Sequence, residues 1–180
     1  MMQKIKLIVI GVVGLLVLFT IIGLLIPSSV KISRGVMIDA DSATVAQIVQ
    51  DVHSWPEWMT WLRAQEGSLV SFAEEEGMSS VQWRSLNKKT KGSITIIGIK
   101  GDLIQLRHAF PGMNISQGAL RIRKVSAQQT EVLWMMDYPL KWYPWERFEG
   151  IFMDAMLGRV IEEALDTLKR RIGEIRNQTS

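Results

Sequence analysis

The residue types that serve general acid–base or metal chemistry are few in this chain. His53 and His108 are its only histidines, and neither stands at a metal-ligand spacing from the other or from an acidic residue. His108 alternates with Ile104, Leu106 and Phe110, so it points to the face that these residues cover. We interpret it as a hydrogen-bonded histidine in the core or at its rim, with a general base as the alternative.

The acidic residues form no catalytic motif either. Glu74 to Glu76 are predicted to form a turn, and Glu162 with Glu163 falls on the polar side of a predicted helix, so neither group makes an acid/base pair. The sequence holds no nucleophile motif, no phosphate-binding glycine loop and no dinucleotide fingerprint. We therefore predict no catalytic residue, no metal site and no cofactor.

The N-terminal stretch is the most apolar part of the chain. Leu7 to Ile26 contains no charge, and its twenty residues suffice to cross a hydrocarbon layer of ~30 Å as a helix. We predict a transmembrane anchor over residues 1–27 and a separate domain over residues 28–180. A cleaved signal peptide is the alternative, but the apolar run is long and no small-residue cleavage site follows it.

Charge suggests both a location and a class of partner. Lys4 and Lys6 favour a cytoplasmic N-terminus, which would make this a single-pass protein of the cell membrane with an extracytoplasmic domain. Without residues 1–26 the chain has 19 basic and 18 acidic residues, so nucleic acid is not an expected partner. Two basic groups are interpreted as solvated surface, with attraction to anionic lipid headgroups as the alternative: Lys88, Lys89, Lys91 and Arg121, Arg123, Lys124.

After the anchor, the pattern predicts one strand and two short helices. Residues 30–38 alternate between apolar and polar types, apart from Arg34 on the apolar side, and this is typical of a strand. Asp41 or Ser42 can cap the first helix. The second contains Trp55, Trp58 and Trp61, which repeat every three residues and need a large apolar partner.

Six further strands are predicted between residues 68 and 138, separated by short polar or glycine-bearing turns. They cover about Ser68–Phe72, Ser80–Leu86, Gly92–Ile99, Leu103–Phe110, Gly118–Val125 and Thr130–Tyr138. The fold class is α+β: one strand, two short helices, an antiparallel six-strand meander and a long C-terminal helix that covers the apolar face of the sheet.

The final helix, from about Trp145 to Ile175, is predicted to have two different halves. From Leu157 onward its apolar residues recur at spacings of three and four residues and form one apolar stripe along the helix. The second set is centred more than a quarter-turn away from that stripe: Trp145, Phe148, Phe152 and Met156. Gly158 stands near the change. Either a kink or a front half that faces something other than the main core would explain the offset.

The sequence resembles members of the START-like, polyketide cyclase/dehydrase and lipid-transport superfamily, which have the helix-grip fold. The resemblance covers roughly residues 30–174 and rests on the element order and on four patches: Ser33–Trp61, the hairpin from Trp83 to Gly92, Thr130–Met136 and Phe152–Lys169. The first and third resemble bacterial members with one N-terminal membrane helix. The resemblance implies a cavity between sheet and helix that holds an apolar molecule.

We expect that cavity to be lined by residues of the strands and of the front half of the helix. The predicted ligand-binding residues are Trp83, His108, Trp134, Met136, Phe148, Phe152 and Met156. Trp142, Tyr143 and Trp145 stand beside Lys141 and suit a membrane interface.

Three functions remain open at this stage. We favour binding of a membrane lipid or another apolar or amphipathic small molecule. The first alternative is a cyclase- or hydrolase-like enzyme that uses the same cavity, for which His108 is the leading candidate residue. The second is a non-catalytic partner in a membrane complex, with the protein partner unknown; an exposed apolar patch around Trp142 to Phe148 would favour it.

Overall fold

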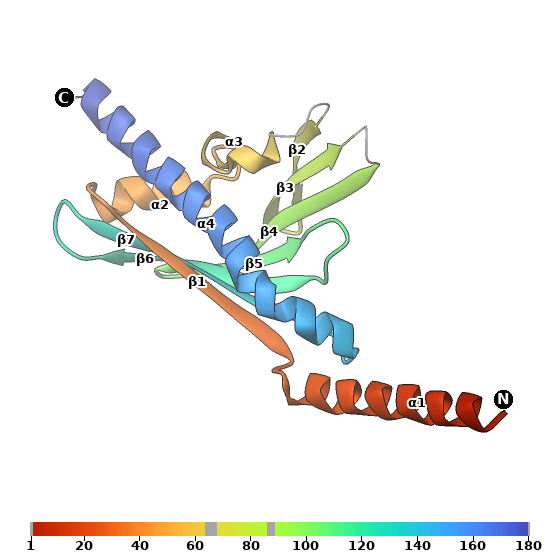
Figure 1. Cartoon of the computed structure of the whole chain (residues 1–180). Helices are drawn as coiled ribbons and strands as arrows, with labels where there is room; N and C mark the ends of the chain where they lie inside the picture. Colours follow the sequence, from red (N-terminus) through yellow and green to blue (C-terminus); the bar gives the residue numbers. More distant parts are fainter. Residues whose placement is uncertain (1, 64–67, 86–88, 180) are drawn as a thin grey trace.

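The computed structural model describes residues 2–63, 68–85 and 89–179. Its elements follow one another in the predicted order (Figure 1). They are α1 (Met2–Leu25), β1 (Ser29–Ile38), α2 (Ser42–Gln50), α3 (Trp55–Trp58), the 3₁₀ helix η1 (Thr60–Leu62), β2 (Ser68–Glu75), β3 (Met78–Ser85), β4 (Thr90–Lys100), β5 (Leu103–Ala109), β6 (Ser116–Lys124), β7 (Thr130–Pro139) and α4 (Pro144–Thr179). The predicted α+β fold is confirmed.

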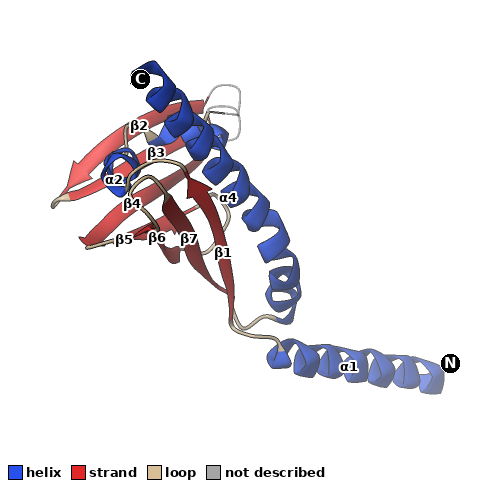
Figure 2. Cartoon of the chain, turned by 90° about the vertical axis from the view of Figure 1, so that its left-hand side faces the viewer, coloured by secondary structure: helices blue, strands red, loops and turns tan. Residues whose placement is uncertain are grey.

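The described strands form one antiparallel sheet in the order β1-β7-β6-β5-β4-β3-β2. The meander runs from β2 to β7, and β1 joins its end by pairing with β7, so that Arg34 stands opposite Trp134. A register shift between Ile96 and Gly98 bends β4. Figure 2 shows the strands curving on one side of α4, which crosses them obliquely.

Local signals explain the short helices between β1 and β2. The carboxylate of Asp41 accepts hydrogen bonds from the backbone N–H groups of Ala43 and Thr44, both at 3.0 Å, and so caps α2. Val45 and Val49 lie on one side of that helix and are buried in the core. Pro56 stands in the first turn of α3, where its missing N–H leaves no hydrogen bond unmade.

The two predicted halves of α4 have different surroundings. The predicted core stripe is confirmed for six residues that are buried in one cluster with the sheet: Leu157, Ile161, Ala164, Leu165, Leu168 and Ile172. In the front half Trp145, Phe152 and Met156 are exposed. The helix is continuous from Pro144 to Thr179, so the offset corresponds to a front half that does not face the core.

Arg34 fastens α4 to the edge strand β1. Its guanidinium donates to both carboxylate oxygens of Asp154, at 3.1 and 3.0 Å, and its Nε donates to Glu162 at 2.5 Å. A Cβ on Gly158 would lie less than 3.0 Å from the guanidinium, so this glycine forms the notch that admits it. The hydrogen bonds that Arg34 donates to Asp154 and, to a lesser extent, to Glu162 raise its pKa, so the guanidinium stays charged.

Because Gly158 makes room for the Arg34 guanidinium, the effect of substituting one of these residues should depend on the other. We expect R34A to lower the free energy of unfolding by roughly 1–2 kcal/mol, since the charge-assisted hydrogen bonds are partly exposed. G158A should destabilise the native chain by displacing the guanidinium, but stabilise the R34A variant by up to about 1 kcal/mol through the helix propensity of alanine. Chemical unfolding of the full chain in detergent, followed by circular dichroism, measures all four proteins.

The matched control is R123A. Arg123 forms an ion pair of 2.9 Å with Glu131 on the outer surface, where loss of the pair should change stability by less than about 0.5 kcal/mol. An equal effect of G158A in both backgrounds would contradict the notch.

Candidate ligand-binding site

The predicted strand residues lie together on the inner face of the sheet. His108, Trp134 and Met136 are buried there, and Trp83 is half-buried. Two glycines make room for the rings: a Cβ on Gly92 would collide with the Trp83 indole, and one on Gly118 would lie 2.7 Å from the His108 ring. The sequence thus leaves space on the sheet for large aromatic side chains.

Seven rings form what we call the aromatic cluster: Trp55, Trp58, Trp61, Trp83, His108, Phe110 and Trp134. His108 stacks between Phe110 and Trp134, with centroid separations of 5.8 and 6.0 Å. The end of the cluster at Trp61, Trp83 and Phe110 is only partly buried. The cluster therefore connects the deepest part of the core with the surface.

Several polar atoms in the aromatic cluster have no partner. Among the described residues, the buried side-chain atoms without a hydrogen bond are the indole nitrogens of Trp61 and Trp134, both ring nitrogens of His108 and the hydroxyl of Ser116. Ser116 stands directly opposite His108 in the sheet. Because buried polar groups are normally hydrogen-bonded, such a gathering marks a place where polar atoms from outside the chain can complete the bonds.

Other indoles of the aromatic cluster do have hydrogen-bond acceptors within the chain. Trp55 donates to the carbonyl of Val49 at 2.9 Å, and Trp58 donates to the hydroxyl of Ser54 at 3.4 Å. Trp61 belongs to the same three-residue series but has no such acceptor. Of the three tryptophans in this series, Trp55 and Trp58 thus have a hydrogen-bonded indole N–H, and Trp61 does not.

His108 is neutral in this surrounding. Burial lowers its pKa from 6.5 to about 4, and the Ser116 backbone beside the ring offsets part of the effect, although the geometry falls short of a hydrogen bond. No ion pair among the described residues involves it. A neutral imidazole offers one donor and one acceptor to a bound molecule.

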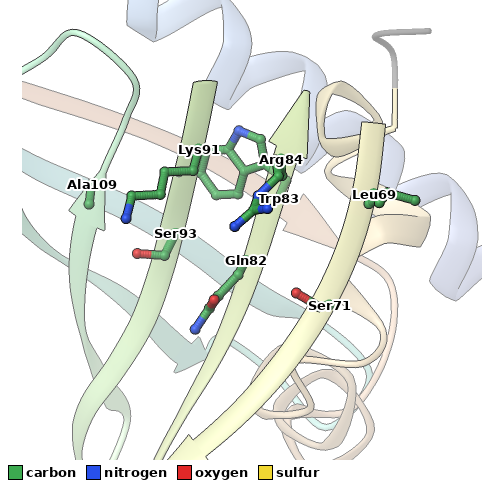
Figure 3. A pocket seen from close by; sticks show the side chains of 9 residues that line it. Leu69, Ser71, Gln82, Trp83, Arg84, Lys91, Ser93 and Ala109 are labelled. Carbon is green, nitrogen blue, oxygen red and sulfur yellow. The ribbon is translucent and has the colours of Figure 1, made fainter. Parts of the chain in front are cut away.

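A separate hollow of about 450 Å³ lies on the outer face of β2 to β5. Figure 3 shows Arg84 and Lys91, which stand opposite each other on β3 and β4, beside Gln82 and Ser93. Trp83 belongs both to this hollow and to the aromatic cluster. The lining combines the polar and basic side chains with apolar ones, among them Leu69 and Trp83.

The structure does not bring the predicted α4 residues into the aromatic cluster. Phe152 is 72% exposed and Met156 is 53% exposed, whereas Phe148 stacks on Phe19 of α1 with a centroid separation of 4.5 Å. Ligand contact by these three residues stays a prediction.

The predicted interface residues lie just before and at the start of α4. Tyr143 stacks on Trp145 at 5.0 Å and contacts Trp142 at 4.9 Å. Glu146 holds this turn by accepting from the Lys141 backbone N–H at 2.7 Å and from the Asn114 side chain at 3.3 Å.

The predicted basic groups differ in their surroundings. Lys88 lies outside the described residues, and Lys89 and Lys91 are exposed. Arg121 and Arg123 pair with Asp102 and Glu131 at 3.8 and 2.9 Å, which agrees with solvated surface charge.

The sequence interpretation missed three residues of the site: Trp61 and Phe110 as members of the cluster and Ser116 as a buried hydroxyl. The period of the tryptophans and the alternation of Phe110 with His108 were available signals. Ser116 gave none, since serine in a strand is usually exposed.

The curved sheet, the long helix laid across it and the aromatic inner face together define a helix-grip protein. The chain belongs to the family described as polyketide cyclase/dehydrase and lipid transport, whose match covers residues 29–173. A search of curated proteins found no match.

Solved structures of low identity share the fold. The ZhuI aromatase/cyclase from Streptomyces sp. R1128 is 16% identical, covers 84% of this chain and 96% of its own, and has a TM-score of 0.58. A START superfamily protein from Mycobacterium smegmatis is 16% identical over 81% and 98%, with a TM-score of 0.59. Norcoclaurine synthase from Thalictrum flavum is 11% identical over 86% and 92%, with a TM-score of 0.56.

The buried His108 predicts a pH dependence of stability. Its folded pKa of about 4 lies below the ordinary 6.5, so the unfolded chain binds more protons between these values. The free energy of unfolding should therefore fall as the pH drops from about 7 to 4, with about 3 kcal/mol of the loss arising from this residue. Unfolding titrations at several pH values measure this slope.

H108Q should remove that component of the slope, because glutamine does not titrate in this range. H53Q is the control, since His53 is the other histidine and is exposed. Identical slopes for H108Q and the native chain would contradict the buried neutral imidazole.

Proposed function

We propose that the chain is a membrane-anchored binding domain for an apolar or amphipathic small molecule, held between the sheet and α4 at the aromatic cluster. Residues 1–27 act as the anchor and residues 28–180 as the binding domain. A lipid is the ligand class that fits both parts, because it is apolar over most of its length and is abundant at the membrane.

One observation carries this proposal: unpartnered polar atoms gather within a buried aromatic surface. An ordinary protein core contains few such atoms, since a buried donor without an acceptor costs roughly 1–3 kcal/mol. Here two indole N–H groups, one imidazole and one hydroxyl share a single region. Apolar walls with a few convergent polar groups are characteristic of small-molecule sites.

The chemistry of these atoms describes the ligand. The indoles of Trp61 and Trp134 can only donate, so they need an acceptor such as a carbonyl, carboxylate or ester oxygen. His108 and Ser116 can each donate and accept. An amphipathic molecule with an oxygen-bearing end and an apolar body satisfies both the polar atoms and the surrounding rings.

The N-terminal helix supports the membrane part of the proposal. By length and composition α1 can cross a bilayer, and its side chains are exposed almost throughout. In our proposal the N-terminus stays in the cytoplasm, as Lys4 and Lys6 favour, and the binding domain lies on the other side.

An enzyme in the same site is a second candidate, favoured by the buried His108 with its lowered pKa. A general base at this position would need a substrate proton within hydrogen-bond reach of a ring nitrogen. Because the pKa of about 4 makes it a weak base at neutral pH, we rank this candidate below ligand binding.

Copurification tests the proposal. The full chain, extracted in a mild detergent and examined by native mass spectrometry, should carry a lipid-sized species. W61F and W134F keep an aromatic ring, a smaller one, but remove the N–H donor. The loss of one hydrogen bond of about 1 kcal/mol should weaken retention about fivefold in each variant.

W55F is the matched control, because the Trp55 N–H already donates to Val49, and its ring contacts only Trp58 among the described rings and none of those with unpartnered atoms. It should lower stability but leave ligand retention unchanged. A native chain without any copurified or exchangeable lipid would contradict the proposal, as would equal retention in W134F and the native chain.

A further inference from the structure

The front of α4 exposes an apolar surface that lies outside the aromatic cluster. Its exposed or half-buried residues on one side of the helix form what we call the front stripe: Trp145, Phe148, Ile151, Phe152, Ala155 and Met156. Phe152 is 72% exposed, and Trp145 and Ile151 are each 59% exposed. Soluble surfaces rarely present so many large apolar side chains together.

The exposed side of the same helix changes character after Met156. From Arg159 to Arg171 its exposed positions are all charged: Arg159, Glu162, Glu163, Asp166, Lys169, Arg170 and Arg171. Before that point Glu149 borders the front stripe. One helix thus passes from an apolar to a charged environment, and the apolar part spans roughly 16 Å at 1.5 Å per residue.

The front of α4 also packs against α1, as Figures 1 and 2 both show. Phe148 stacks on Phe19, a Cβ on Gly23 would lie 2.9 Å from Pro144, and a guanidinium nitrogen of Arg147 donates to the carbonyl of Ile26 at 2.5 Å. Phe19 and Gly23 lie on successive turns of α1, and Ile26 follows its last residue, so the three contacts hold the two helices in a defined relation.

These contacts set a depth for the front stripe. Phe19 stands seven residues before Ile26, so it lies about 10 Å inside the end of an apolar run that fills a hydrocarbon layer of about 30 Å. Phe148, stacked on Phe19, must lie at a similar level.

We propose that the front stripe of α4 is embedded in the leaflet of the bilayer next to the domain, docked against α1, while α4 from Arg159 onward lies in water. This inference rests on α1 spanning the membrane, as proposed above. The domain is then held at two points, and the α1 contact fixes its tilt toward the bilayer. Trp142 and Tyr143, which come just before the stripe, occupy the interface, as aromatic side chains of mixed polarity commonly do.

A lipid bilayer fits the front stripe better than a protein partner does. The stripe is continuous with the surface of α1, so whatever solvates α1 at Phe19 also reaches Phe148 and its neighbours. A protein partner would have to bind at the same depth. The change to charge after Met156 matches the limit of a hydrocarbon layer.

The absence of cysteine makes a direct test available. Single cysteines replace Phe152 in the stripe, Leu15 in α1 and Glu163 on the charged part of α4, all of which are exposed. Each full-length variant carries a nitroxide and is placed in phosphatidylcholine nanodiscs. Relaxation by oxygen, which concentrates in lipid, is compared with relaxation by a water-soluble nickel chelate.

We expect the labels at F152C and L15C to favour oxygen and the label at E163C to favour nickel, with at least a fivefold difference in the ratio between F152C and E163C. A ratio at F152C equal to that at E163C, with L15C protected, would overturn the inference and leave the membrane span intact. A water-exposed L15C would instead overturn the span itself.

A second measurement separates lipid from a protein partner. If another copy of the chain covered the stripe, F152C labels on two copies would broaden each other's spectra, and dilution with unlabelled chain would abolish the effect. Such broadening would overturn the lipid assignment. Its absence, together with the oxygen preference, supports it.

Discussion

The ion pairs between Arg34 and two acids of α4 set how the long helix lies on the sheet, and the features of the two halves of the helix follow from that placement. Arg34 stands on the edge strand β1, opposite Trp134, and reaches over the notch at Gly158 to Asp154 and Glu162. Because the planar guanidinium uses both ends of its fork, it fixes both the position and the rotation of the helix. A lysine at this position would hold α4 only as a point charge.

Two consequences follow from this fixed helix. From Leu157 to Ile172, α4 turns its apolar residues onto the sheet and completes the core. Before Leu157, the same rotation leaves Phe152 and Met156 exposed, and Phe148 contacts Phe19 of α1. The change in side-chain character along α4 thus reflects one rotation of a continuous helix, with core on one side and apolar surface on the other.

Sequence patterns predicted the elements well because they depend on local periodicity. The six strands, the capped α2 and the buried stripe of α4 all follow from the alternation or helical spacing of neighbouring residues. Strand ends differ by a few residues; β3, for example, begins at Met78, two residues earlier than predicted.

The rest depended on partners far away in the chain. Arg34 looked like an interruption of its strand, because Asp154 and Glu162 are 120 and 128 residues distant. Trp55, Trp58 and Trp61 are equivalent in the sequence, and only the surrounding structure shows that the third lacks an acceptor. Likewise, only the structure shows that Gly92 and Gly118 lie under aromatic rings that leave no room for a side chain.

The most direct test of ligand binding is a crystal structure of the full chain determined with the species that it retains on purification. We expect elongated non-protein density on the aromatic cluster, with an acceptor atom ~3 Å from the indole nitrogen of Trp134 and a polar atom at the same distance from a ring nitrogen of His108. A structure without such density, in which these nitrogens are hydrogen-bonded to each other or to a single water, would contradict ligand binding at the aromatic cluster.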